Sequence, residues 1–167
     1  MSLPATPGQT IGPFFGYALP YDGAPLLVPA DHPDAVLLHG RVLDGAGDPV
    51  PDALLELWQA APEGRVGDGF AGFGRAETDA EGRYAFTTLT PAAPFFALTV
   101  LARGLTDRLF TRAYLPEHPG VAQDPLLAAL ALGRRRTLLV LADDDGWRFD
   151  VRLQGEDETV FLTYPRH

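Results

Sequence analysis

The sequence predicts an all-β fold, a β-sandwich of about eight short strands with an N-terminal arm and one short helix. Three observations carry this prediction. The chain has 18 glycines and 16 prolines among 167 residues, a usage that favours short elements joined by tight turns. Short apolar runs and apolar–polar alternation recur between the turns, as in sandwiches. No long amphipathic helix interrupts them, and the length suits one domain better than two.

Residues 1–34 form the predicted arm. They are rich in proline and contain four aromatic residues within a short stretch, Phe14, Phe15, Tyr17 and Tyr21. Flexible tails are poor in aromatic residues. We therefore expect the arm to pack on its own domain or on a neighbouring subunit, and residues 35–167 to form the sandwich.

The eight predicted strands follow one another between turn clusters rich in Asp, Gly and Pro. They are expected at residues 35–43, 53–59, 84–88, 94–102, 108–115, 137–141, 147–153 and 159–164. Residues 143–146, Asp-Asp-Asp-Gly, are predicted to close a hairpin between 137–141 and 147–153. Residues 159–164 are expected to be a final edge strand.

A short helix is predicted over residues 126–132. Asp124 is a suitable N-cap, Pro125 suits the first helical position, and Gly133 is expected to end the helix.

Composition excludes several classes of function. The chain has 13 basic and 22 acidic residues, a net charge of −9, and all its basic residues are arginine; this argues against a nucleic-acid partner. The absence of cysteine excludes thiol catalysis and thiolate metal sites. The single serine, Ser2, excludes serine hydrolysis. The N-terminus does not resemble a signal peptide and no apolar run is long enough for a membrane span, so a cytoplasmic location is expected.

Histidine and arginine are the remaining candidates for chemistry. The four histidines, His32, His39, His118 and His167, lack metal-ligand spacing and are interpreted as unrelated. Arg103 follows a predicted strand and precedes a glycine, and Arg112 lies in the next strand. Either guanidinium could bind a carboxylate bidentately. The alternative is a surface ion pair in an acidic protein, and the residues alone leave both open.

Four segments together resemble the intradiol ring-cleavage dioxygenase family. They are Thr-Pro-Gly-Gln-Thr-Ile-Gly-Pro-Phe-Phe at 6–15, the segment 40–60 ending in Glu-Leu-Trp-Gln-Ala, the segment 73–88, which is similar to a family hairpin, and the C-terminal segment 148–162. They occur in the family's order along nearly the whole chain. The resemblance implies a β-sandwich related to enzymes that open catechol rings.

The resemblance also implies that this chain cannot hold the family's iron. Catalytic members bind Fe(III) through two tyrosines and two histidines. Phe95 and Ala97 stand where the histidines would be, residues 89–94 are too few to supply one tyrosine, and no tyrosine lies between Gln59 and Phe73. The chain is most similar to iron-free α subunits, whose Fe(III) is held by an iron-bearing β subunit in a hetero-oligomer.

The same resemblance assigns substrate-binding residues and a reaction. Arg103 would bind the substrate carboxylate, and Thr10, Gly12 and Pro13 would line the pocket of the partner; whether Arg103 or Arg112 dominates is left open. The implied reaction is O2-dependent cleavage of protocatechuate to 3-carboxy-cis,cis-muconate, with this chain inactive alone.

Two alternatives remain. One is a stand-alone transthyretin-like β-sandwich that binds a partner without catalysis, because residues 42–53 and 78–86 are common to such modules. Residues 10–14 and 148–161 favour the dioxygenase. The other, a self-sufficient dioxygenase with relocated ligands, needs an iron site that the tyrosines and histidines do not offer.

Overall fold

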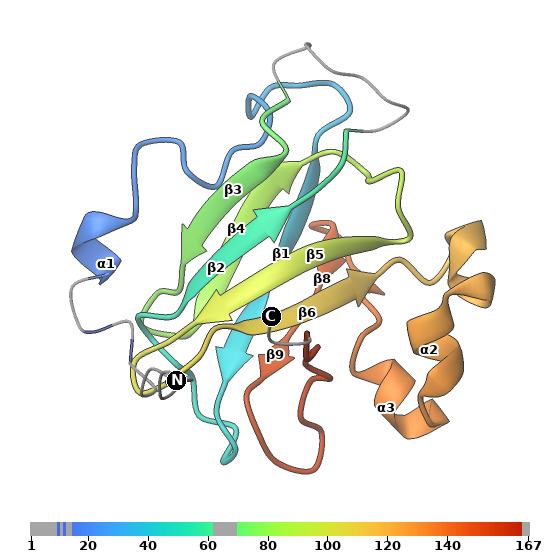
Figure 1. Cartoon of the computed structure of the whole chain (residues 1–167). Helices are drawn as coiled ribbons and strands as arrows, with labels where there is room; N and C mark the ends of the chain where they lie inside the picture. Colours follow the sequence, from blue (N-terminus) through green and yellow to red (C-terminus); the bar gives the residue numbers. More distant parts are fainter. Residues whose placement is uncertain (1–9, 11, 13–14, 62–69, 165–167) are drawn as a thin grey trace, which may run out of the picture.

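The computed structural model describes residues 10, 12, 15–61 and 70–164 and shows two β-sheets packed as layers (Figure 1). The first sheet has the strand order β4-β1-β8-β7, with β9 also paired to β1, and the second has the order β3-β2-β5-β6. The strands are β1 (Val36–Leu43), β2 (Leu54–Trp58), β3 (Phe73–Glu77), β4 (Arg83–Thr88), β5 (Phe95–Leu101), β6 (Leu109–Tyr114), β7 (Leu141–Ala142), β8 (Trp147–Arg148) and β9 (Val151–Arg152). The predicted all-β sandwich is confirmed.

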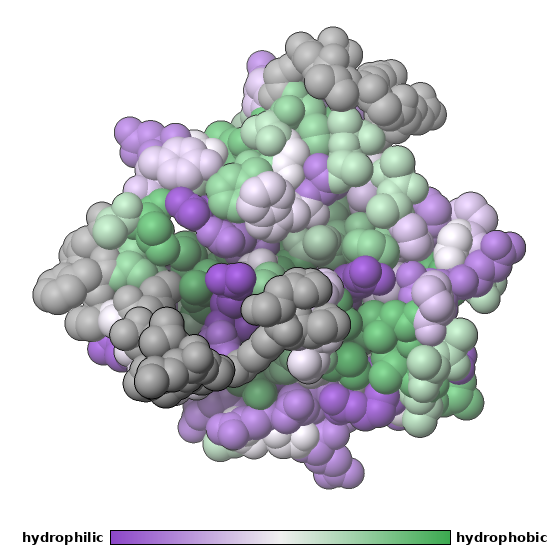
Figure 2. All heavy atoms as spheres, viewed as in Figure 1, coloured by the Kyte–Doolittle hydropathy of each residue, from purple (hydrophilic) through white to green (hydrophobic). Residues whose placement is uncertain are grey.

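The core lies between the two sheets. It is formed because successive side chains of a strand point alternately toward the other sheet and away from it. In β5, Phe96, Leu98 and Val100 point into the core, so their neighbours point to the opposite face. The largest buried side chains of the core cluster come from both sheets and from the arm: Leu27, Leu38, Val42, Leu55, Leu57, Phe86, Phe96, Leu98 and Phe149. The outer surface mixes apolar and charged residues (Figure 2).

The described part of the arm packs on the chain's own sandwich. After the short helix α1 (Phe15–Ala18), Leu27 N–H donates to Thr87 O in β4, and Leu27 O accepts from Ala71 N–H. Arg75 N–H in β3 donates to Ala24 O. The segment therefore joins the β4 edge of the first sheet to the β3 edge of the second. The packing of residues 1–34 on a partner subunit stays a prediction.

The segment 73–88 is not the hairpin that the resemblance implied. β3 pairs with β2 in the second sheet, whereas β4 pairs with β1 in the first. Thr78 N–H donates to Ala53 O and so keeps that end of β3 beside β2. The carboxylate of Asp79 then accepts from the N–H groups of Glu81 and Arg83. These bonds make the predicted tight turn, but the turn carries the chain from one sheet to the other.

The single predicted helix over 126–132 is also wrong. Three short helical segments follow β6: the 3₁₀ helix η2 (Pro119–Gln123), α2 (Pro125–Ala129) and α3 (Leu132–Arg136). Asp124 caps α2 as predicted, accepting from the N–H groups of Leu126 and Leu127. Leu130 and Ala131 have extended backbones, and the Arg135 side chain donates a hydrogen bond to Leu130 O. The helix is therefore interrupted at these two residues, and Gly133 lies inside α3 rather than at a helix end.

The C-terminal strands are shorter than predicted. The hairpin exists, because Leu141 pairs with Arg148 and the carboxylate of Asp143 accepts from two turn N–H groups. However, Thr137 and Leu138 form the turn after α3, Leu139 makes only an isolated bridge to Tyr114, and Leu141 alone of 137–141 belongs to a strand. The predicted strand 147–153 splits into β8 and β9, both parallel to β1.

Residues 159–164 form no strand and contribute only a bridge between Leu162 and Phe110. Thr159 bonds to Arg152, Val160 to Thr137 and Leu162 to Phe110. Successive residues thus bond to different segments, which prevents one continuous ladder. Among the described residues, no helix has the length and apolar character needed to cross a bilayer.

Candidate functional site

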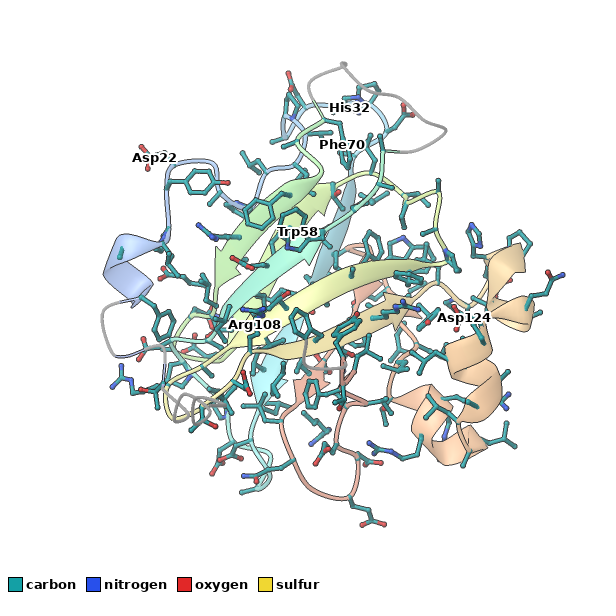
Figure 3. All side chains as sticks on the ribbon, viewed as in Figure 1. Asp22, His32, Trp58, Phe70, Arg108 and Asp124 are labelled. Carbon is teal, nitrogen blue, oxygen red and sulfur yellow. The ribbon has the colours of Figure 1, made fainter. Side chains whose placement is uncertain are left out.

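The outer face of the second sheet carries a row of side chains that includes a predicted site position. Strand register places Phe73, Trp58, Ala97 and Arg112 side by side across β3, β2, β5 and β6. Trp58, labelled on β2 in Figure 3, is 55% exposed, and its ring centroid lies 4.5 Å from that of Phe73. Phe95, two residues before Ala97, also points to this face, since Phe96 faces the core.

Arg112 occupies the space beside the two predicted ligand positions. Its guanidinium carbon lies 4.1 Å from the centroid of the Phe95 ring. Its Nη1 donates to the Tyr114 hydroxyl at 3.1 Å and lies 3.8 Å from the Asp124 carboxylate. The guanidinium therefore lies over the Phe95 ring, and Arg112 is the residue of β6 that pairs with Ala97.

The charges around Arg112, Tyr114 and Asp124 indicate that these residues stabilise the fold rather than bind a metal. Burial raises the pKa of the Tyr114 phenol, although the hydrogen bond from Arg112 acts in the opposite direction. The phenol therefore stays neutral rather than becoming a phenolate. Asp124 is only 8% exposed, lies between β6 and α2 (Figure 3), and both caps α2 and balances Arg112. Arg112 thus links the sheet to the helices.

Asp124→Ala is expected to lower the free energy of unfolding by about 2 kcal/mol, because it removes an N-cap and the partner of Arg112. Urea denaturation measures the effect. Asp144→Ala, at an exposed position of the 143–146 turn, is the matched control and should leave the midpoint almost unchanged. Equal midpoints for the two variants would contradict this role of Asp124.

Arg103, the other predicted carboxylate binder, lies at the end of the second sheet, in the turn that follows β5. The next residue, Gly104, has φ +91°, which a side chain would disfavour. Arg103 Nη2 donates to Asp52 Oδ2. The two side chains are 64% and 53% exposed, so the ion pair anticipated as an alternative exists, yet the guanidinium is accessible.

Thr10 lies against the same loop. A hollow of about 310 Å³ is lined by Thr10 and by the residues on either side of Arg103, Leu101, Ala102, Leu105, Thr106, Asp107 and Arg108. Gly12 has φ +80°, and a Cβ added there would meet nothing within 4 Å. Pro13 lies outside the described residues. The structure thus brings Thr10 and the Arg103 loop together.

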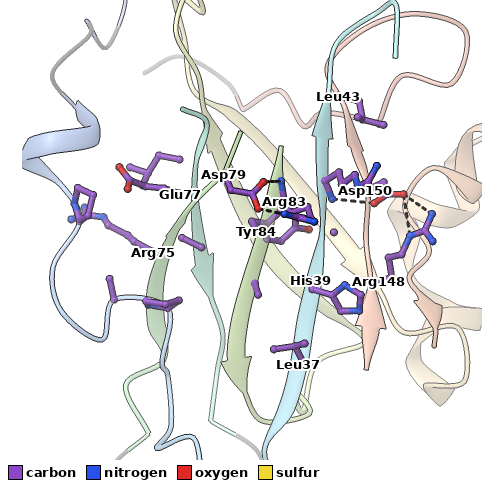
Figure 4. Close-up of a pocket in the computed structure, with 18 of the residues that line it drawn as sticks. Leu37, His39, Leu43, Arg75, Glu77, Asp79, Arg83, Tyr84, Arg148 and Asp150 are labelled. Carbon is purple, nitrogen blue, oxygen red and sulfur yellow. Dashed lines mark hydrogen bonds and ion pairs between the residues drawn. The ribbon is translucent and has the colours of Figure 1, made fainter. Parts of the chain in front are cut away.

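A hollow of about 990 Å³ was not anticipated from the sequence. It lies over β1 and β4 and reaches the arm and β3, and several of its polar side chains are paired, as Figure 4 shows for Arg83 with Asp79 and for Arg148 with Asp150. The pairs are His39 with Asp143, Arg83 with Asp79 and Arg148 with Asp150. Hydrogen bonds from His39 and from the Arg83 backbone hold the pKa values of Asp143 and Asp79 below their usual range. Because several distant segments supply this lining, no local motif could have indicated it.

Each described histidine makes a hydrogen bond within the chain. His39 lies 3.1 Å from Asp143, while His32 Nδ1 accepts from Asp34 N–H and His118 Nδ1 from Gly120 N–H. Within the described ranges, no three acidic or histidine side chains gather in a metal-binding group.

Comparison with known proteins assigns the family. A family model described as a dioxygenase matches residues 11–119. The chain is 39% identical to the protocatechuate 3,4-dioxygenase alpha chain of Burkholderia cepacia, over 96% of this chain and 98% of that one. The chain belongs to the intradiol dioxygenase family. The resemblance seen in the sequence is thereby confirmed.

Two further relatives define the family context. The protocatechuate 3,4-dioxygenase beta chain of Burkholderia cepacia is 32% identical, over 75% of this chain and 67% of that one. Among solved structures, the dioxygenase domain of a dioxygenase–carbohydrate-binding protein fusion from Streptomyces sp. SirexAA-E has a TM-score of 0.64 at 28% identity, covering 90% of this chain and 98% of that one. Both an alpha and a beta chain are therefore similar to this chain.

Intradiol dioxygenases depend on non-haem Fe(III), and the residues of β5 and β6 do not fit that ion. At the two positions that the resemblance assigns to histidine ligands, Phe95 offers a hydrocarbon ring and Ala97 a methyl group. Neither can ligate a metal. The guanidinium of Arg112 lies over the Phe95 ring and would repel a ferric ion there.

Proposed function

We propose that this chain is the iron-free α subunit of a protocatechuate 3,4-dioxygenase. An iron-bearing β subunit holds Fe(III), and this chain completes the substrate pocket of that subunit. The observation that carries the proposal is the Arg112–Phe95 stack beside Ala97, which puts a cation where the resemblance places the ligands of catalytic members. The match to an alpha chain over 98% of its length supports the same assignment.

The role proposed for this chain is recognition of the substrate anion. Protocatechuate carries a carboxylate, and moving a carboxylate out of water is costly unless a cation pairs with it. Arg103 is accessible and uses one N–H donor for Asp52, so it can bind the substrate carboxylate. Thr10, Gly12 and Pro13 would line the pocket beside it.

Arg112 is a weaker candidate for this role. Its guanidinium already contacts Phe95, Tyr114 and Asp124, and a substrate would have to break these contacts. The complex would cleave protocatechuate between its hydroxyls with O2, giving 3-carboxy-cis,cis-muconate. The role of this chain in the complex is to bind and orient the substrate, and correct positioning of the substrate raises the rate of ring cleavage. A cytoplasmic location remains part of the proposal.

Purification of the chain alone and after co-expression with the β chain of its own organism tests this function. The isolated chain is expected to contain no iron, to be colourless, and to take up no O2 with protocatechuate. The co-expressed pair is expected to co-purify as a coloured, iron-containing complex that consumes O2. Stoichiometric iron in the isolated chain would refute the assignment, and failure of the pair to associate would favour the stand-alone binding module.

A further inference from the structure

The geometry at the end of the second sheet points to a residue that acts through Arg103. β2 and β5 are antiparallel neighbours, with Leu54 opposite Leu101. Two residues beyond that pair, the same register places Asp52 opposite Arg103. The side-chain bond from Arg103 Nη2 to Asp52 Oδ2 therefore lies just beyond the end of the β2–β5 ladder, and the pairing of these strands brings the two residues together.

Asp52 has an unusual backbone. Its φ is +64°, and it is the only non-glycine residue with positive φ in the described ranges. Such conformations are uncommon, although Asp tolerates them better than most residues, and they are enriched at functional sites. The left-handed backbone directs the carboxylate from the turn before β2 toward the loop after β5.

The turn that contains Asp52 is held from both sides by one buried side chain. The hydroxyl of Thr78 donates to Val50 O and accepts from Ala53 N–H, both at 2.8 Å, and Thr78 N–H donates to Ala53 O. Thr78 is only 7% exposed. Val50 and Ala53, which lie on either side of residues 51 and 52, are therefore held in place, so that the surrounding structure can maintain a strained conformation at Asp52.

We propose that Asp52 is the positioning residue for Arg103, holding one edge of its guanidinium so that the other edge faces the carboxylate of the substrate. This inference rests on the function proposed above. Asp52 accepts from Nη2 alone, whereas a guanidinium has five N–H donors arranged as a planar fork. The remaining donors make no hydrogen bond within the described part of the chain and are available for a second carboxylate.

Asp52 would favour substrate binding by ordering the Arg103 side chain, not through its own charge. An exposed arginine side chain loses up to about 2 kcal/mol of rotamer entropy when it is fixed, and holding it beforehand removes part of that loss from binding. The negative charge of Asp52 partly offsets the attraction of Arg103 for an anion. That charge is felt locally, because burial and then Asp52 raise the pKa of Glu77. An uncharged acceptor at position 52 should therefore serve as well as aspartate.

The test compares three substitutions at position 52 in the co-expressed α/β complex. Asp52→Asn keeps an acceptor oxygen and tolerates the left-handed backbone, Asp52→Ala removes the acceptor, and Asp52→Gly removes it while relieving the backbone. kcat and KM are measured with protocatechuate and with catechol, which lacks the carboxylate. We expect Asp52→Ala and Asp52→Gly to raise KM for protocatechuate roughly threefold to tenfold, with kcat and the KM for catechol unchanged. Asp52→Asn should show the wild-type KM or a lower one.

Each contrary result has a distinct meaning. A lower KM in Asp52→Ala would show that Asp52 competes with the substrate, and an asparagine variant no better than alanine would show that its charge matters; either overturns the proposal. Equal increases for catechol and protocatechuate would reveal a structural role and also overturn it. In an Arg103→Ala background, Asp52→Ala should have no further effect. If Arg103→Ala itself changes nothing, the function proposed for Arg103 fails, independently of Asp52.

Discussion

Arg103→Ala in the α/β complex is expected to raise KM for protocatechuate about a hundredfold. Removing one partner of a desolvated, hydrogen-bonded charge pair costs about 3 kcal/mol, which corresponds to that factor. This expectation rests on the accessibility of the Arg103 guanidinium, in the turn after β5, to the substrate carboxylate. Steady-state O2 uptake measures it, with catechol as the comparison substrate because catechol has no carboxylate. KM for catechol should change little.

Two further variants sharpen the result. Arg41→Ala makes the same change in charge at an exposed residue of the first sheet and should leave both KM values near wild type. Arg103→Lys keeps the charge but loses the planar fork, so its KM for protocatechuate should lie between those of alanine and arginine. Equal effects of Arg103→Ala on catechol and protocatechuate would remove the carboxylate-binding role.

Gly40→Ala is expected to prevent stable folding. A Cβ on Gly40 would lie 2.0 Å from Phe149 O and 2.6 Å from Phe149 C. These are backbone atoms that cannot move independently, because Phe149 N–H donates to His39 O at 2.7 Å and Phe149 O accepts from the buried Tyr84 hydroxyl at 2.6 Å. Separating β1 from the segment between β8 and β9 should cost at least about 3 kcal/mol, a large part of a typical domain's stability.

Soluble yield and urea denaturation measure this effect. Gly133→Ala is the matched control, since a Cβ there would meet nothing within 4 Å and the residue lies inside α3. That variant should be more stable than wild type by about 0.5–1 kcal/mol, because alanine favours the helix. A Gly40→Ala variant with the wild-type midpoint would show that the segment between β8 and β9 can move away from β1.

Local signals in the sequence were enough to predict most of the longer strands of both sheets. Residues 35–43, 53–59, 94–102 and 108–115 contain β1, β2, β5 and β6, because short runs of strand-forming residues are bounded there by turn residues. The prediction failed where bonds to distant segments decide the structure. Residues 159–164 have strand-like composition, yet they bond to three separate parts of the chain.

The candidate site divides in the same way. The family resemblance pointed to positions 95 and 97, and the side-chain types of Phe95 and Ala97 alone rule out metal ligation there, whatever the fold. The contact of Asp52 with Arg103 could not be predicted, since the two residues lie 51 positions apart in the chain. Nor does the residue type at position 52 predict a left-handed backbone there. The role of Arg112 was open for the same reason, because its contacts Phe95 and Asp124 come from other elements, β5 and the N-cap of α2.

The sequence by itself determined the fold class, the family resemblance and the lack of ligating side chains on β5. These follow from residue chemistry and short-range periodicity, which do not depend on which segments meet. Only the tertiary structure decided that 73–88 passes between sheets, that Arg112 is engaged by Asp124, and that Arg103 is held by Asp52. These are contacts between residues far apart in the chain, and strand register, rather than any local pattern, brings them together.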